Sequence, residues 1–64
     1  MLTSVQFIRL PQVKEMTSLS KQSIYRLMGQ GDFPKQVSLG ARSVAWVKSQ
    51  VEDWCAQKLS ASLS

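Results

Sequence analysis

Apolar residues first recur with helical spacing after a leucine–proline pair near the start of the chain. Leu10-Pro11 is a good helix start, because proline loses no hydrogen bond in the first turn of a helix. Val13 and Met16 then lie three residues apart on one face. This pattern predicts a helix of about two turns that ends at Thr17-Ser18-Leu19. Residues 1–8 carry few signals and are interpreted as an extended arm or a short strand.

A second amphipathic segment follows this break. Ser20 is a suitable N-cap, because its hydroxyl can accept a hydrogen bond from a main-chain N–H one turn later. Ile24, Leu27 and Met28 form an i, i+3, i+4 stripe for the core. Glycines on both sides of Gln30 end the helix. The opposite face is polar and basic, and it consists of Gln22, Arg26 and Gly29, flanked by Lys21, Ser23 and Tyr25.

The next apolar residues alternate with polar ones, as they do in β-strands. After Phe33-Pro34, residues 35–38 and 42–47 have the pattern of a β-hairpin with a turn near Leu39-Gly40-Ala41. The alternation predicts an inner side made of Val37, Leu39, Val44 and Trp46, and an outer side made of Ser38, Ser43 and Ala45.

The last segment predicts a third helix. Residues 49–52 (SQVE) have the pattern of a capping box, in which the serine and the glutamate each satisfy a free main-chain N–H. An apolar stripe follows, made of Val51, Trp54, Cys55 and Leu59. Residues 60–64 are expected to fray, as chain ends do.

The aromatic residues and the cysteine each have two interpretations. Trp46 and Trp54 can stack on the bases of a single-stranded nucleic acid, but their inward positions favour core packing, as for Phe33. Cys55 is interpreted as a small buried apolar residue, because the acidic residues near it disfavour a reactive thiolate. Tyr25 can either pack on the hairpin or offer its hydroxyl to a phosphate.

Length and composition exclude several classes of function. The chain has 64 residues, 44% of them hydrophobic and 19% charged, which is the composition of one small globular domain. With one cysteine and no histidine, it has no internal disulfide, no histidine-activated nucleophile and no obvious zinc site. No apolar run approaches the ~20 residues of a membrane span. We therefore expect a reduced, cytoplasmic protein without catalytic activity, cofactor, metal or membrane partner.

The positive charge is concentrated in one part of the chain. The net charge is +4 and the isoelectric point about 9.7. Seven basic and two acidic residues lie between positions 9 and 48, whereas the last sixteen residues have a net charge of −1. This asymmetry suits a polyanionic partner, although charge alone is equally consistent with a solubilising surface.

Together these elements predict a small α+β fold of the winged helix-turn-helix class over residues 9–59, with the arm at 1–8 and a frayed tail at 60–64. A helix with a polar face fits the major groove of double-stranded DNA, and the hairpin acts as the wing. Gly40 keeps the wing narrow enough to approach a minor groove. The predicted DNA-binding residues are Ser20, Lys21, Gln22, Ser23, Tyr25, Arg26, Lys35, Arg42 and Ser43.

Four motifs resemble the AlpA family of small prophage regulators. They are residues 19–26 (LSKQSIYR), 31–34 (GDFP), 39–46 (LGARSVAW) and 49–54 (SQVEDW). The resemblance runs over about three-quarters of the chain. It implies a MerR-type winged-helix fold and a role as a transcriptional regulator or an excisionase, which binds beside an attachment site and biases an integrase towards excision.

The resemblance also implies roles for individual residues. Residues 20–23 match the base-reading end of the recognition helix, Tyr25 and Arg26 its backbone contacts, and Arg42 the wing contact. This sequence departs from many members at Ser18, where they have glycine, and at Gln50, where they have glutamate.

Other interpretations stay open at this level. A protein-binding adaptor would present the same basic face to a partner protein, and Arg26 can pair with Asp32 on the surface. One helix and one wing neutralise roughly four to six phosphates, so we expect weak binding by one copy and self-association on DNA. An integrase is a further candidate partner, and no small-molecule ligand is expected.

Overall fold

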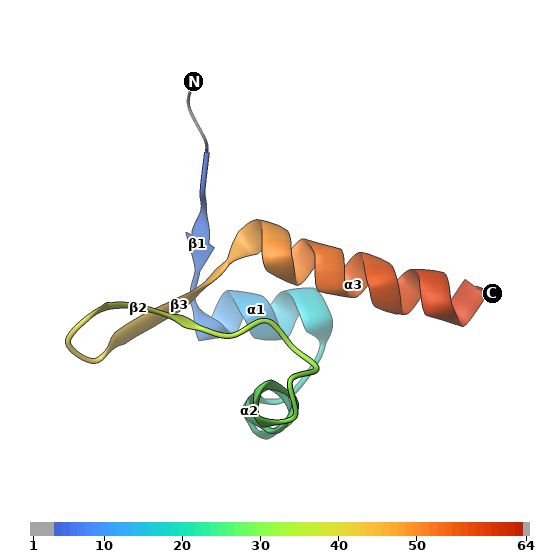
Figure 1. Cartoon of the computed structure of the whole chain (residues 1–64), viewed down its shortest axis with the longest axis horizontal. Coiled ribbons are helices and arrows are strands. Elements are labelled where there is room, and N and C mark those ends of the chain that lie inside the picture. The colour runs from blue at the N-terminus through green and yellow to red at the C-terminus, as the bar shows by residue number, and fades with distance from the viewer. Residues whose placement is uncertain (1–3, 64) are drawn as a thin grey trace.

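The computed structural model describes residues 4–63, which form three helices and a three-stranded antiparallel sheet. In chain order the elements are β1 (Phe7–Ile8), α1 (Leu10–Thr17), α2 (Lys21–Gly29), β2 (Val37–Gly40), β3 (Ser43–Val47) and α3 (Lys48–Leu63) (Figure 1). Two short helices, a hairpin and a longer third helix follow one another as the sequence predicts. The small α+β, winged helix-turn-helix fold class is therefore confirmed.

Local signals fix the two short helices. Pro11 lies in the first turn of α1, and the helix ends at Ser18, which adopts a left-handed conformation with φ 62°. Three residues later α2 begins, and the Ser20 hydroxyl accepts a hydrogen bond from the main-chain N–H of Ser23 at 3.2 Å. Both predicted helices and the short turn between them are confirmed.

The core lies where the three helices meet one face of β3. Its buried members are Ile8, Val13, Ile24, Phe33, Trp46 and Val51. Trp54 packs against this cluster, where its ring meets Phe33 edge to face at 4.9 Å and its indole N–H donates to the carbonyl of Asp32 at 2.7 Å. Cys55 packs there too, and its thiol approaches the carbonyl oxygen of Met16 at 3.7 Å. These contacts confirm the core interpretation of both tryptophans and Phe33, whereas Cys55, expected to be buried, is half-buried at the edge of the core.

The sheet corrects two of the expected orientations. β3 is the central strand, with Ile8 of β1 opposite Trp46 and Val37 of β2 opposite Ala45. Ala45 is fully buried instead of solvent-exposed, because its small side chain lies in a strand flanked on both sides. Leu39 is 46% exposed instead of inward-facing, because the strand pairing shifts at this residue between Ser38 and Gly40.

The start of α3 differs from the expected capping box. The helix begins at Lys48, directly after the last residue of β3, so Ser49 lies inside the first turn and does not cap it. The main-chain N–H of Lys48 instead donates to the carbonyl of Gln6 at 2.8 Å. The predicted capping box is therefore wrong, because the chain passes from strand to helix without a loop.

Three boundaries also differ from the prediction. The hairpin turn lies at Ala41 and Arg42, slightly later than expected. Leu59 is 62% exposed and does not reach the core, and α3 continues through the predicted tail to Leu63, with Ser64 outside the described residues. In the predicted arm, Phe7 and Ile8 belong to the sheet, whereas residues 1–3 lie outside the described part of the chain.

Candidate nucleic-acid interface

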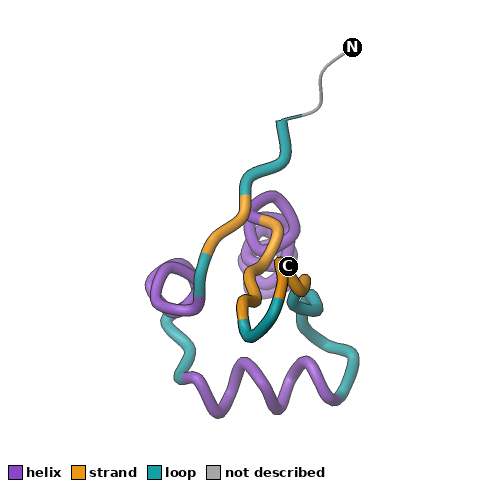
Figure 2. Tube along the Cα trace, turned by 90° about the vertical axis from the view of Figure 1, so that its left-hand side faces the viewer, coloured by secondary structure: helices purple, strands orange, loops and turns teal. Residues whose placement is uncertain are grey.

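Helix α2 and the β2–β3 hairpin project from the body of the molecule and enclose one side of it. In Figure 1, α2 is seen end-on at the bottom, and the hairpin extends to the left, away from the C-terminal end of α3. In Figure 2, which views that side, α2 runs along the lower edge and the hairpin lies above it. The recognition helix and the wing are therefore available to one ligand at the same time.

The N-terminal end of α2 presents several hydrogen-bond donors. The Ser20 hydroxyl accepts from the N–H of Ser23 and donates its own proton to the Ser23 hydroxyl oxygen at 3.1 Å. Ser23 therefore keeps its hydroxyl proton for an external acceptor. The main-chain N–H groups of Lys21 and Gln22 also meet no acceptor in the described part of the chain. Such donors at a helix N-terminus favour an anion.

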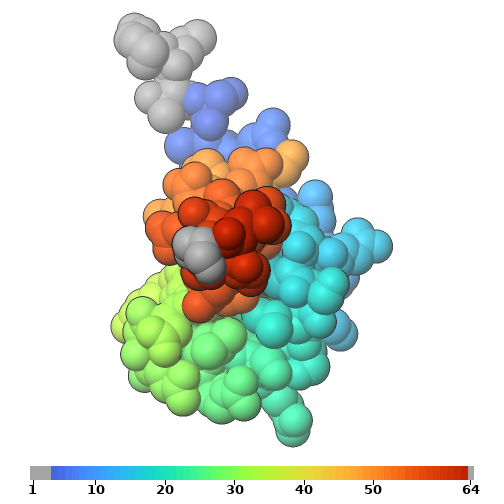
Figure 3. All heavy atoms as spheres, turned by 90° about the vertical axis from the view of Figure 1, so that its right-hand side faces the viewer, coloured from blue at the N-terminus to red at the C-terminus, as the bar shows by residue number. Residues whose placement is uncertain are grey.

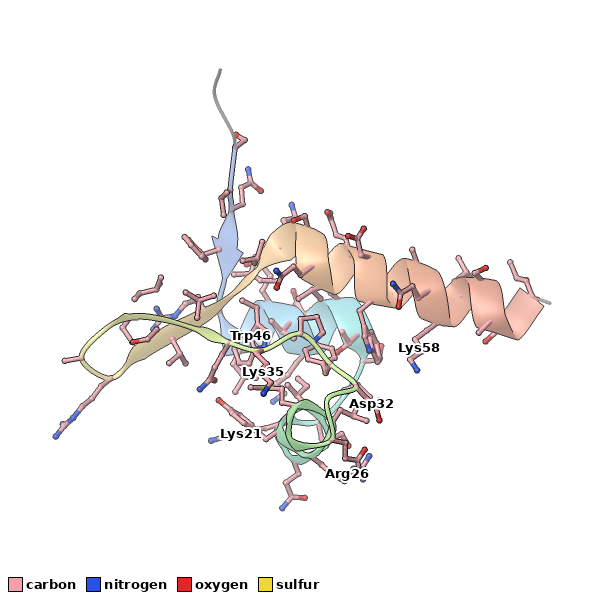
Figure 4. All side chains as sticks on the ribbon, in the orientation of Figure 1. Lys21, Arg26, Asp32, Lys35, Trp46 and Lys58 are labelled. Carbon is pink, nitrogen blue, oxygen red and sulfur yellow. The ribbon has the colours of Figure 1, made fainter. Side chains whose placement is uncertain are left out.

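The outward face of α2 carries long polar side chains and no acidic residue. Lys21, Gln22 and Arg26 are all exposed. Figure 4 shows Lys21 to the left of α2 and Arg26 at its lower right, so the two side chains leave the helix on different sides. The alternative ion pair between Arg26 and Asp32 is not formed in the part of the chain that the structure describes. The exposed part of α2 thus combines an amide side chain with positive charge.

The wing presents Arg42 at its tip. Arg42 is exposed and has a left-handed φ of 59°, and Gly40 precedes it with a φ of 151°. Glycine is favoured at such a φ because a Cβ would be strained there. The hairpin therefore closes tightly and leaves the Arg42 side chain at its outer end.

One wing contact brings in a residue that the sequence reasoning did not include. The guanidinium of Arg9, which precedes α1, donates to the hydroxyl oxygen of Ser43 at 3.0 Å. Ser43 thus keeps its proton, and Arg9 adds a positive charge beside the wing, next to its turn. Arg9 lay in the predicted basic stretch, but a contact across 34 positions leaves no local sequence signal.

Tyr25 joins the recognition helix to the base of the wing. Its hydroxyl donates to the side-chain oxygen of Gln36 at 3.1 Å, and its ring lies edge-on to Trp46 with centroids 6.2 Å apart. Packing on the hairpin, one of the two interpretations of Tyr25, is therefore confirmed. Gln36 was absent from the predicted site, although its neighbour Lys35 was included, because its contact with Tyr25 joins positions eleven residues apart and leaves no local sequence signal.

Other kinds of site find no support in the described residues. Within residues 4–63, no group of three Cys, Asp or Glu side chains is arranged to hold a metal ion. None of the helices described has the length and apolar character needed to cross a membrane. The α2–wing face, which gathers most of the predicted binding residues, is the candidate functional site.

Comparison with known proteins identifies a matching family and two relatives of similar sequence. Residues 6–59 match the model of the family described as prophage CP4-57 regulatory protein (AlpA). An uncharacterized protein, ORF88 of Enterobacteria phage P4, is 43% identical over 58 residues, which cover 91% of this chain and 66% of that protein. The DNA-binding transcriptional activator AlpA of Escherichia coli (strain K12) is 29% identical over 62 residues, covering 88% of this chain and 89% of that protein.

The chain thus spans slightly less than two thirds of the phage protein and most of the bacterial one. The family match begins before β1 and continues into α3, so it includes the helix-turn-helix, the wing and the core that joins them. Because sequence motifs, fold and family match coincide over the same residues, the chain belongs to the AlpA family of prophage regulatory proteins.

Proposed function

We propose that this protein binds double-stranded DNA sequence-specifically as a regulator of a prophage or genomic island. The observation that carries the proposal is the α2–wing face, where Lys21, Gln22 and Arg26 are exposed without an acidic residue in α2, beside a wing tipped by Arg42. A helix of this size fits the major groove, and the wing reaches the flanking minor groove. The name of the E. coli relative, a DNA-binding transcriptional activator, supports this function.

The chemistry of each side chain suits a particular contact. The Gln22 amide can form two hydrogen bonds with adenine, and Lys21 can pair with guanine or phosphate. Ser20 caps the helix that presents them, and the Ser23 hydroxyl suits a phosphate oxygen. Arg26, Lys35, Arg42 and Ser43 complete the proposed contacts with the DNA backbone and the minor groove.

Two regulatory roles use this same surface. A transcriptional regulator would bind near a promoter, whereas an excisionase would bind beside an attachment site and bias an integrase towards excision. Either role is exercised on DNA in the bacterial cytoplasm, at the nucleoid. The site that binds more tightly, the promoter or the attachment site, distinguishes the two roles.

The test compares Gln22→Ala with Arg26→Ala in fluorescence-anisotropy titrations. The duplexes are the DNA upstream of the gene, the nearest attachment site and a scrambled sequence, each at two salt concentrations. Gln22→Ala should reduce the preference for the native duplexes, and Arg26→Ala should weaken binding to all three and lower the salt slope by about one. Equal, weak binding of the unaltered protein to all three duplexes would favour the protein-binding adaptor instead.

We also propose that copies of this protein associate on DNA through the end of α3. One module of this size buries only about 600–1,000 Å² on DNA, so binding by one copy is weak. Leu59 and Leu63 are 62% and 78% exposed and lie four residues apart, on one face of the helix. Figure 3 looks onto this end of α3, which faces the viewer near the centre of the molecule.

Two leucines from each copy cover far less than the ~1,200 Å² of a stable interface. The protein should therefore sediment as a monomer without DNA and bind a duplex with two adjacent sites cooperatively. The double variant Leu59→Ser/Leu63→Ser should keep its affinity for a single site and lose this cooperativity. A variant that remains cooperative on the two-site duplex would show that the copies meet elsewhere.

A further inference from the structure

The segment between α2 and β2 contains a DNA contact that neither the sequence motifs nor the fold class assigns. We infer that the side-chain NH₂ group of Gln36 donates to a phosphate of the DNA backbone, and that Tyr25 acts as the positioning residue that orients it. This inference rests on the proposed function, because it requires α2 in a major groove and the wing at the next minor groove.

The place of Gln36 in the fold determines which part of the DNA it meets. The major and minor grooves of a duplex are neighbours separated by one phosphodiester strand. A protein that places a helix in one groove and a wing in the next must therefore cross that strand between them. Residues 30–36 join α2 to the first strand of the wing. Within this segment Phe33 is buried and Asp32 contacts Trp54 of α3, whereas Lys35 is exposed and Gln36 contacts Tyr25 of α2. Lys35 and Gln36, next to β2, are therefore the residues placed to meet this phosphodiester strand. Figure 4 shows Lys35 of the same segment on the side towards α2, where it adds positive charge.

The hydrogen bond from Tyr25 decides which end of the Gln36 amide is free. The Tyr25 hydroxyl donates to the side-chain oxygen of Gln36 at 3.1 Å. The acceptor end of the amide is thus occupied, and the NH₂ group meets no acceptor in the described part of the chain. Because phosphate oxygens only accept hydrogen bonds, this free donor is the end of the amide that a phosphate can use.

The same hydrogen bond engages the Tyr25 hydroxyl, which would otherwise be available to a phosphate. Its hydroxyl proton is already donated to Gln36, so Tyr25 reaches a phosphate directly only by giving up this contact. Its ring is held edge-on against the fully buried Trp46, which fixes the position of the hydroxyl. Tyr25 is therefore suited to hold Gln36 in place while Gln36 contacts the DNA.

A neutral donor leaves a distinctive signature in binding experiments. The salt slope counts the positive charges that displace counterions from DNA, and Gln36 carries no charge. Losing its contact should thus lower affinity without changing the salt slope. Because a phosphate carries no sequence information, the loss should be equal for a cognate and a scrambled duplex.

The experiment measures binding of four variants to the tightest duplex selected from a random-sequence library and to its scrambled form. Gln36→Met removes the amide and should weaken binding roughly tenfold, as expected for a hydrogen bond to a charged group. Tyr25→Phe keeps the ring and should weaken binding roughly threefold through the lost orientation. The double variant should bind DNA no more weakly than Gln36→Met alone, because both changes remove the same contact between Gln36 and the phosphate. Gln57→Met on α3 is the matched control and should bind normally.

Several results would overturn the inference. Unchanged binding by Gln36→Met would show that the residue makes no contact, and a loss confined to the selected duplex would indicate a base contact instead. Additive losses in the double variant would make Tyr25 an independent phosphate ligand. Arg26→Ala in the same assay separates this inference from the proposed function. If it weakens binding where Gln36→Met does not, only the Gln36 contact fails. A library that yields no duplex bound more tightly by the unaltered protein than its scrambled form would refute the sequence-specific DNA-binding function itself.

Discussion

At the scale of single residues, two non-glycine residues within positions 4–63 adopt the left-handed backbone conformation that glycine prefers. They are Ser18, with φ 62°, and Arg42, with φ 59°. Ser18 ends α1, where its N–H donates to the carbonyl of Lys14 at 2.8 Å, and it turns the chain towards α2. The glycine that many family members have at this position fits that geometry, because a Cβ costs about 1–2 kcal/mol in the left-handed region.

Replacing Ser18 with glycine should therefore stabilise the protein. Removing the strain of the Cβ outweighs the greater chain entropy that glycine gives the unfolded state, which costs about 0.4–1 kcal/mol. We expect the Ser18→Gly variant to gain roughly 0.5–1 kcal/mol in the free energy of unfolding, measured by urea denaturation. Ser18→Ala keeps the Cβ and should show no such gain. A lower urea midpoint for Ser18→Gly would contradict this account.

At the scale of elements, the N-terminal ends of α2 and α3 differ in how their first N–H groups are satisfied. α2 has a side-chain cap, because Ser20 accepts from Ser23. α3 has no side-chain cap from Ser49, because the helix continues directly from β3. The N–H of Lys48 donates instead to the carbonyl of Gln6, the residue before β1. The two serines look alike in the sequence but have different roles.

Alanine at each serine tests this difference. Ser20→Ala removes an N-cap and should lower the free energy of unfolding by about 1 kcal/mol. Ser49→Ala lies inside a helix, where alanine has the highest propensity, and should leave stability unchanged or raise it by a few tenths of a kcal/mol. Thermal unfolding of both variants is the measurement. If Ser49→Ala lowered stability as much as Ser20→Ala, this would support the capping box and contradict a direct junction between β3 and α3.

The same elements show what the sequence can and cannot predict. The three helices and the hairpin follow from local periodicity, caps and glycines, which act within a few residues. The register shift at Leu39 and the burial of Ala45 depend instead on which strands flank β3. At the site, the exposed face of α2 was predictable from its 3.6-residue period. The Arg9–Ser43 and Tyr25–Gln36 contacts were not, because each joins segments that only the folded chain brings together.

At the scale of the whole molecule, the wing and the C-terminal end of α3 lie at opposite ends (Figure 1). The hairpin extends in one direction and the end of α3 in the other, with α2 beneath the core (Figure 1). Lys58 of α3 lies over the ring of Trp54, with its ammonium nitrogen 5.4 Å from the ring centroid. Lys21 instead projects from α2 on the proposed DNA side (Figure 4). These two lysines carry the same charge but have different positions relative to the duplex.

Glutamine at each lysine separates position from net charge. Either change lowers the net charge from +4 to +3, so both variants weaken long-range attraction to DNA equally. Only Lys21→Gln removes a charge from the proposed interface, and its salt slope should fall by about 0.9 for the lost phosphate contact. Lys58→Gln should keep the slope of the unaltered protein. Titrations at four salt concentrations measure both slopes. An equal change in the two variants would mean that DNA responds only to the total charge of the protein, and the recognition surface would then have to lie elsewhere than on α2.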